Sequence, residues 1–259
     1  MSEILGIDTN NYAVQSIRAT GGGEINLQDK SVTITQNGTT TVNPDTGYDG
    51  LSSVEVNTNV QSNYNTKMDA SYGFNYNYGL NTIITEIKEL DTSSVTNMYY
   101  AFRALRVVTF PMINTSSVTN MEGTFTRCNN LTTIPLIDTA NVTNMSSMFN
   151  QCPELVTIPS INTSKVQNTN SMFGHCAKLQ NLPVFNLEKV TNCGYMFDDC
   201  PLLTNESLNN VLASLISVTR SLNHAKTLKA VGLSSSQATI CQSLSNWDAF
   251  VAAGWSSGY

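Results

Sequence analysis

The sequence has little charge and no long apolar run. Only 12% of its 259 residues are charged and the net charge is −6, so the charged share is about half the usual one. Binding to nucleic acid needs clustered Lys and Arg, which this composition does not supply. No stretch approaches the roughly 18 apolar residues of a membrane-spanning helix. The first residues lack a basic start followed by an apolar run, so we expect no signal peptide and no membrane insertion.

Patterns for catalysis and metal binding are missing as well. The two histidines, His175 and His224, have no partner that spacing predicts. Most cysteines recur once per repeat rather than in the close pairs of zinc sites, and we interpret them as buried free thiols. Cys193 and Cys241 lie outside that column, and their reactivity is left open. The acidic pair at residues 198–199 indicates calcium only weakly, because no Gly-spaced loop accompanies it. We expect a protein that is not an enzyme and that has no cofactor or metal.

What the sequence does contain is an internal repeat. The segment DTSSVTNM at Asp91 returns in related form at Asn114, Asp138, Asn162 and Asn186, in steps of 23 or 24 residues. Two columns in the same phase are the phenylalanines Phe102, Phe125, Phe149, Phe173 and Phe197 and the asparagines Asn97, Asn120, Asn144, Asn168 and Asn192. One coil of this length cannot close a core, but a stack of coils can.

This period predicts an α/β solenoid of the leucine-rich-repeat type over residues 82–205. Each repeat of about 24 residues would supply a short parallel strand, such as 155–158, and a short helical turn, such as 147–152. The phenylalanines would point inward, and the asparagines would occupy inward positions where they bond backbone groups at a tight corner. A proline column, which includes Pro135 and Pro159, follows the proposed strands and limits them to three or four residues.

The repeat pattern (D/N)TSxVTNMxxMFxxCxxLxxIP resembles the BspA-like branch of leucine-rich repeat proteins over residues 82–205. The departures are Thr169 and Cys193 in place of Met, and residues 104–105 in place of Cys in the first copy. The resemblance implies the leucine-rich-repeat fold and, as one function, a bacterial cell-surface adhesin.

The two ends have a different character. Residues 1–60 hold seven acidic and two basic residues, a net charge of −5, and alternation at 31–35, an Asn37-Gly38 turn, and apolar alternation at 40–42 and 54–56 predict a hairpin-based β module. The segment NGTTTVNPDTGYDGLSSVEV is similar to a short β module of bacteriophage tail and baseplate proteins. Residues 61–81 are expected to form a connector.

Residues 206–259 are expected to form a helical cap. Helical spacing after Asn205, its expected N-cap, predicts one helix, and LSSSQATICQSL and NWDAFVAAGW predict two more. This ending resembles that of repeat proteins encoded in phage and prophage genomes. Trp247 and Trp255 are expected to pack within the cap rather than against a ligand.

Candidate binding residues are the outward positions of the predicted strands, together with an aromatic pair: Thr109, Thr133, Thr157, Asn181, Tyr99 and Tyr100. Small polar side chains suit a neutral glycan or a protein partner. The alternative is that they only solvate the surface.

Together these features predict a bacteriophage structural protein. It would be a tail or baseplate fibre or a capsid decoration, made in the host cytoplasm and located in the virion. Residues 1–60 would contact other virion proteins and support a homo-oligomer, with a trimer favoured, and the repeats would bind a host-surface glycan or protein. The alternatives are a BspA-like bacterial adhesin and a cryptic hydrolase.

Overall fold

The computed structural model describes residues 95–259 in full and, before them, only the backbone of six short strands. These strands are β1 (Ile7–Asp8), β2 (Ala13–Val14), β3 (Ile25–Asn26), β4 (Ser31–Ile34), β5 (Ser53–Val56) and β6 (Glu86–Leu90). β1 pairs with β2 and β3 with β4 in antiparallel fashion, whereas β4, β5 and β6 pair in parallel. Residues 40–42 of the predicted hairpin and the predicted connector at 61–81 lie outside the described residues.

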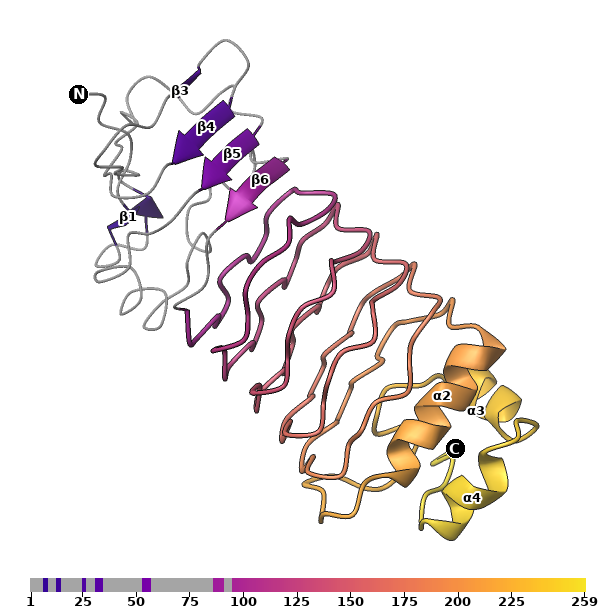
Figure 1. The fold of residues 1–259 in the computed structure, drawn as a ribbon. Helices are drawn as coiled ribbons and strands as arrows, with labels where there is room; N and C mark the ends of the chain where they lie inside the picture. The colour runs from indigo at the N-terminus through magenta and orange to yellow at the C-terminus, as the bar shows by residue number, and fades with distance from the viewer. Residues whose placement is uncertain are drawn as a thin grey trace.

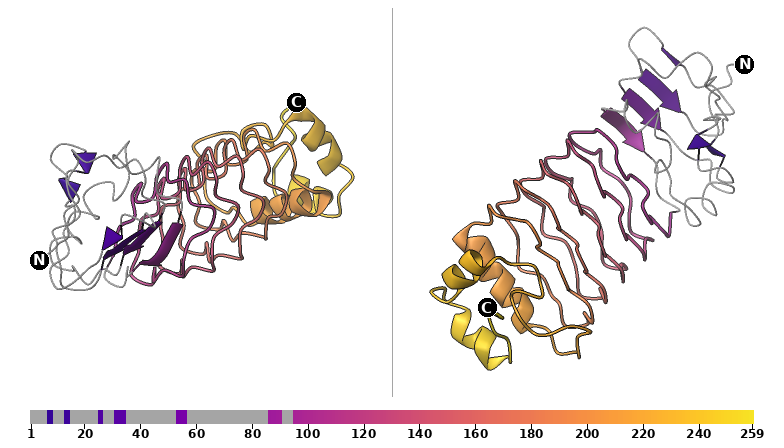
Figure 2. Two further views of the ribbon diagram at one scale, coloured as in Figure 1. Left: turned by 90° about the horizontal axis from the view of Figure 1, so that it is seen from above. Right: turned by 180° about the vertical axis from the view of Figure 1, so that it is seen from behind.

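From residue 95 the chain winds into a stack of coils (Figure 1), and the two further views show the same succession (Figure 2). Each coil donates backbone hydrogen bonds to the next one. The N–H groups of Met98, Met121, Met145 and Thr169 donate to the carbonyls of Asn120, Asn144, Asn168 and Asn192 over 2.8–2.9 Å. The register therefore equals the sequence repeat, so equivalent residues lie above one another.

The predicted fold class, an α/β solenoid with short parallel strands, is wrong. Residues 95–259 contain no strand and only three short helices, all of them after the last coil. Where a strand was expected at 155–158, Val156 N–H donates to Thr132 O over 3.0 Å and a single isolated bridge joins Thr157 to Asn181. A strand needs consecutive bridges, and the proline that follows, Pro159, has no N–H with which to continue the ladder.

The expected helical turn at 147–152 is also absent. The chain there forms successive tight turns, in which Met148 N–H donates to Met145 O and Asn150 N–H donates to Ser147 O. The N–H groups of Ser147 and Phe149, which alternate with those of Met148 and Asn150, donate instead to carbonyls of the next coil. A helix would keep all these N–H groups within its own segment, so the bonds between coils exclude it.

The phenylalanines form a continuous column inside the stack. Their ring centroids are 5.6, 5.4, 5.6 and 6.0 Å apart along the series Phe102, Phe125, Phe149, Phe173 and Phe197. The rings of Phe149 and Phe173 are inclined by only 3°, and all five are buried. Full burial of such a side chain contributes roughly 1.5–3 kcal/mol, so the column is a major part of the core.

A column of cysteines lies beside the phenylalanines. Each thiol donates a hydrogen bond of 3.0–3.1 Å to the carbonyl of a phenylalanine one coil earlier, as in Cys152 to Phe125 and Cys176 to Phe149. All six cysteines are free and buried. Burial raises the pKa of Cys128 and Cys200 to about 12. These thiols therefore stay protonated at neutral pH and link adjacent coils as hydrogen-bond donors.

Three helices follow the last coil: α2 (Asn205–Ile216), α3 (Ser235–Cys241) and α4 (Trp247–Ala252). They fall where the sequence predicted helices, although the N-cap of α2 is Thr204 rather than Asn205. α2 lies along the end of the stack (Figure 1). It places the hydroxyls of Ser207, Ser214 and Ser217 against the backbone N–H groups of Leu182, Phe185 and Leu187, at 2.8–2.9 Å. The serine hydroxyls accept hydrogen bonds from these N–H groups and so replace the acceptors that a further coil would supply.

Candidate functional site

One side of the stack is built from the tight turns, and we call residues 97–104 and their equivalents in later coils the turn face. Two residues of each coil on this face have a positive φ. They are Tyr100 and Ala104, Gly123 and Arg127, Ser147 and Gln151, Ser171 and His175, and Tyr195 and Asp199. A left-handed conformation costs a residue other than glycine roughly 1–2 kcal/mol. This conformation is nevertheless kept in every coil, because it orients alternate N–H groups so that they donate to carbonyls of the next coil.

The asparagine column borders the turn face. Each Asn Oδ1 accepts the N–H two residues later, as in Asn144 from Ser146 at 3.0 Å and Asn168 from Asn170 at 3.1 Å. All five asparagines are half-buried rather than inward. Successive members are joined by isolated parallel bridges. The column thus organises the entry to each turn within its own coil.

The turn face carries a pocket of about 280 Å³ over the first three coils. Its lining includes Tyr99, Tyr100, Arg103, Arg127, Asn150 and Gln151, together with the hydroxyl residues Thr126 and Ser147. Among the described residues, the lining contains two guanidinium groups and no carboxylate. By contrast, the lining of the pocket beside the last coil includes Asp198 and Asp199 as well as Lys229.

The two arginines of the pocket are held differently. The Arg103 guanidinium lies 5.6 Å from the centroid of the Tyr100 ring, and that ring meets Tyr99 edge-on at 4.7 Å. Arg127 is exposed, and its Nε donates to Gln151 Oε1 over 2.8 Å. Because this bond uses only Nε, the Nη atoms of Arg127 have no hydrogen-bond partner in the part of the chain that is described in full.

The tyrosines were predicted as binding residues, and the structure places both in the pocket. The other lining residues were missed. One signal was available, since Arg103 and Arg127 lie 24 residues apart, and so in neighbouring copies of the repeat, in a chain with few charges. The approach of Tyr100 to the next coil had no such signal.

The predicted polar positions of the other face lie apart from the pocket. Thr109 and Asn181 are exposed, whereas Thr133 and Thr157 are half-buried. The hydroxyls of the last two contact the carbonyls of Ile134 at 3.4 Å and Asn181 at 3.5 Å. Neither this pocket nor the one beside Asp198 and Asp199 is lined by any of these four.

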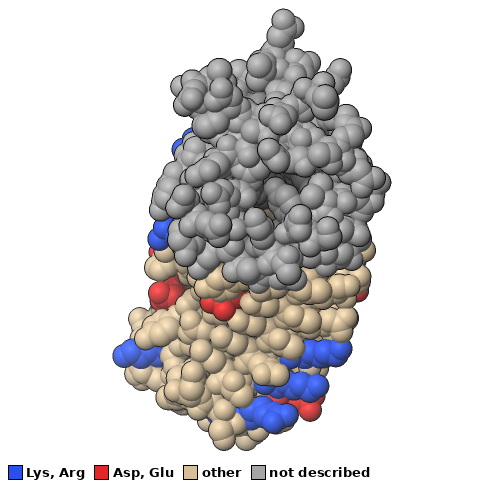
Figure 3. Space-filling model, turned by 90° about the vertical axis from the view of Figure 1, so that its left-hand side faces the viewer, with Lys and Arg blue, Asp and Glu red and all other residues tan. Residues whose placement is uncertain are grey.

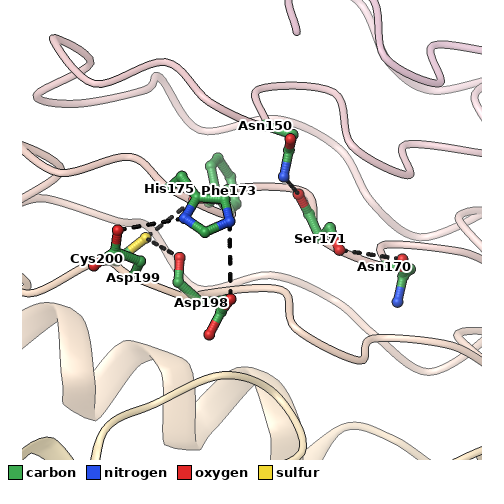
Figure 4. Close-up of polar contacts among 8 residues, drawn as sticks. All are labelled: Asn150, Asn170, Ser171, Phe173, His175, Asp198, Asp199 and Cys200. Atoms are coloured by element: carbon green, nitrogen blue, oxygen red, sulfur yellow. Dashed lines mark hydrogen bonds and ion pairs between the residues drawn. The ribbon is translucent and has the colours of Figure 1, made fainter. Parts of the chain in front are cut away.

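The histidines and acidic residues make contacts that spacing did not predict. His175 Nδ1 lies 3.3 Å from Asp199 Oδ2, and its Nε2 lies 4.0 Å from Asp198 Oδ2 (Figure 4). All three side chains are about half exposed or more. A second pocket of about 430 Å³ adjoins Asp198 and Asp199, where the last coil meets Lys229 and Tyr259. Residues 95–259 contain no group of three or more His, Cys, Asp or Glu side chains that could hold a metal ion.

Cys193 and His224 form a pair in which neither group is free for catalysis. Cys193 Sγ lies 3.5 Å from His224 Nε2, but this nitrogen already accepts the Cys193 backbone N–H at 3.2 Å. His224 Nδ1 in turn lies 2.8 Å from the Ala225 carbonyl. Burial raises the pKa of Cys193 to about 12, which is opposite to the lowered pKa of a nucleophilic cysteine. For Cys241, burial raises the pKa to about 11.

The surface of the stack is mostly uncharged. In the view of Figure 3, Lys and Arg lie mainly along the two sides of the described part, with few acidic groups between them. No helix in the described part of the chain is long and apolar enough to span a membrane.

These features define a repeat protein whose coils are joined by backbone hydrogen bonds and by its buried cysteines, and whose turn face carries a polar pocket. The comparison with family models gives overlapping matches to one family, described as "Mycoplasma protein of unknown function, DUF285", at residues 52–133, 108–211 and 129–236. These matches together span well over half of the chain, and the protein belongs to the DUF285 family. BspA-like proteins carry related repeats. No curated protein and no solved structure matched the chain.

Proposed function

We propose that this protein is a non-enzymatic structural component of a bacteriophage particle, either a tail or baseplate fibre or a capsid decoration. In this role the coil stack is displayed to bind a host-surface glycan or protein. The observation that carries the binding role is the polar pocket on the turn face, because its guanidinium, amide and hydroxyl groups are arranged around a hollow. A few convergent polar groups in a concave site are the usual mark of ligand binding.

The non-enzymatic part of the proposal is supported by how the reactive groups are used. The thiols of the cysteine column are buried and donate to backbone carbonyls. The one Cys–His pair in the described residues has its imidazole committed to the backbone.

The particle role is supported by sequence similarity alone. Residues 37–56 are similar to a β module of phage tail and baseplate proteins, and we propose that residues 1–60 contact other virion proteins and assemble the chain into a homo-oligomer, with a trimer favoured. The test is mass spectrometry of purified particles, together with light scattering of the purified full-length protein. Its presence in particles and an oligomeric mass are expected. A monomer that is absent from particles would refute the particle role.

The second candidate is a bacterial cell-surface adhesin. It is favoured by the relation of the repeats to those of BspA-like proteins and by a family description that refers to a bacterial genus. Protease treatment of intact producing cells distinguishes the two, because an adhesin is cleaved at the cell surface and a virion protein inside the cell is protected.

A further inference from the structure

We infer that the pocket on the turn face binds a single sugar ring that carries a carboxylate. This inference rests on the proposed binding function and names the ligand class and the site. It is carried by the pocket lining, by its charge, and by one glycine that makes room for it.

The charge of the pocket selects an anion. Among the described residues, Arg103 and Arg127 line it and no acidic residue does. The carboxylate of Glu122 belongs to the same coil as Arg127 but accepts a hydrogen bond from Asn144 Nδ2 at 2.8 Å and is not part of the lining. With Nε bonded to Gln151, the planar fork of Arg127 presents its remaining N–H groups, and such a fork matches the two oxygens of a carboxylate.

The remaining groups of the pocket suit a sugar ring rather than a bare ion. Within residues 95–259, the amide nitrogen of Gln151 makes no hydrogen bond, and Asn150 Nδ2 makes only a long contact of 3.5 Å to Ser171 O. Amide groups of this kind bind sugar hydroxyls as donors and acceptors. The pocket volume of about 280 Å³ lies just below the range of about 300–1,000 Å³ for drug-sized ligands. One pyranose unit fits this size better than a longer ligand.

Gly123 shows that this coil departs from the repeat to form the pocket. A Cβ at Gly123 would lie 2.3 Å from the Tyr100 ring. The equivalent positions in the next two coils are Ser147 and Ser171, which have nearly the same positive φ, 54° and 53° against 61°. The backbone therefore tolerates serine at this position, and what requires glycine here is the space that the Tyr100 ring occupies at the wall of the pocket.

Two substitutions that copy other coils remove parts of the site. Arg127→Gln gives this coil the residue that Gln151 supplies in the next one, and it removes the exposed guanidinium. Gly123→Ser gives it the serine of the next coil and displaces the Tyr100 ring. His175→Gln is the matched control, because His175 occupies the position of Arg127 two coils further on and lies outside the pocket.

The experiment is calorimetric titration of the full-length protein with glucuronate, glucose and inorganic phosphate. Glucuronate is expected to bind, and glucose and phosphate to bind at least about tenfold more weakly, because each lacks one half of the recognised chemistry. Arg127→Gln and Gly123→Ser should each weaken glucuronate binding by about tenfold or more. His175→Gln should leave it unchanged, and circular dichroism melting curves should show that the variants are folded.

Three outcomes would overturn the inference. The inferred site is refuted if glucuronate does not bind, or if neither Arg127→Gln nor Gly123→Ser weakens its binding. If phosphate binds as tightly as glucuronate, the pocket is a simple anion site. If glucose binds as tightly as glucuronate, the pocket does not recognise the carboxylate. If Gly123→Ser unfolds the protein, Arg127→Gln alone decides. None of these results depends on whether particles contain the protein, so the mass spectrometry test of the proposed function succeeds or fails separately.

Discussion

The buried cysteines make the stability of the protein sensitive to alkaline pH. Burial raises the pKa of Cys128, Cys193 and Cys200 from an ordinary value of 9.0 to about 12, and it raises the pKa of Cys152 and Cys176 well above 9.0. The folded state therefore holds protons that the unfolded state releases. The stabilisation is complete below about pH 9 and is lost as the pH rises from about 9 towards 12.

The size of the effect follows from these values. At about pH 10 a thiol in the unfolded chain is roughly nine-tenths ionised, while the buried thiols remain protonated. Each one then lowers the free energy of unfolding by about 1 kcal/mol relative to neutral pH. Five such thiols remove roughly 5–7 kcal/mol, which is comparable to the whole stability of many domains, about 5–15 kcal/mol.

The assay is urea unfolding under reducing conditions at about pH 7.5 and about pH 10. Cys152→Ala should reduce the alkaline loss by about 1 kcal/mol, because one thiol no longer titrates. Leu136→Ala changes an exposed side chain that does not titrate and should leave the loss unchanged. An alkaline loss that Cys152→Ala does not reduce would refute the reasoning. So would rapid alkylation of the folded protein by iodoacetamide at neutral pH, because it requires accessible thiolates.

Three further predictions concern single side chains. Phe149→Ala should lower the free energy of unfolding by about 3–5 kcal/mol in urea titrations, whereas truncation of the exposed Leu136 should change it by less than about 0.5 kcal/mol; equal effects would contradict the ring column. Ser214→Ala should cost about 1–3 kcal/mol, because it leaves the buried Phe185 N–H without a partner, and the exposed Ser221 is the control position for the same measurement. Ser147→Gly should be neutral or stabilising by up to about 1 kcal/mol in thermal melts, since it relieves a positive φ of 54°; a clear loss would show that this position is not strained.

The repeat could be read from the sequence because identical side chains meet only when the register equals the period. The ring column and the helices of residues 205–252 follow from that register and from helical spacing. The absence of strands from the coils after residue 95 was not foreseen, although Pro135 and Pro159 indicated how short the pairing had to be. The backbone bonds between coils on that side are scattered, such as Val156 to Thr132 and Lys178 to Pro153, and they are too few to define a strand.

The turn face could not be predicted for a different reason. Positive φ values are expected at glycine, yet on this face only Gly123 carries that signal, and residues such as Ser147, Gln151 and His175 adopt the same conformation. The requirement comes from hydrogen bonds between coils that are distant in sequence. The pocket likewise depends on how one tyrosine lies over a neighbouring coil, so only its two tyrosines were anticipated.

The most direct test of the stacked coils is a disulfide placed across them. Lys178 Nζ lies 2.6 Å from Glu154 Oε2, and Lys178 N–H donates to Pro153 O over 3.1 Å, so positions 154 and 178 are neighbours in adjacent coils. Under mild oxidation, Glu154→Cys combined with Lys178→Cys should form a disulfide that peptide mass mapping locates in the folded protein. Glu154→Cys combined with Lys165→Cys should not form one, because Lys165 contacts Asn141 on another part of the coil. A disulfide in the second pair, or none in the first, would contradict the register on which the whole account depends.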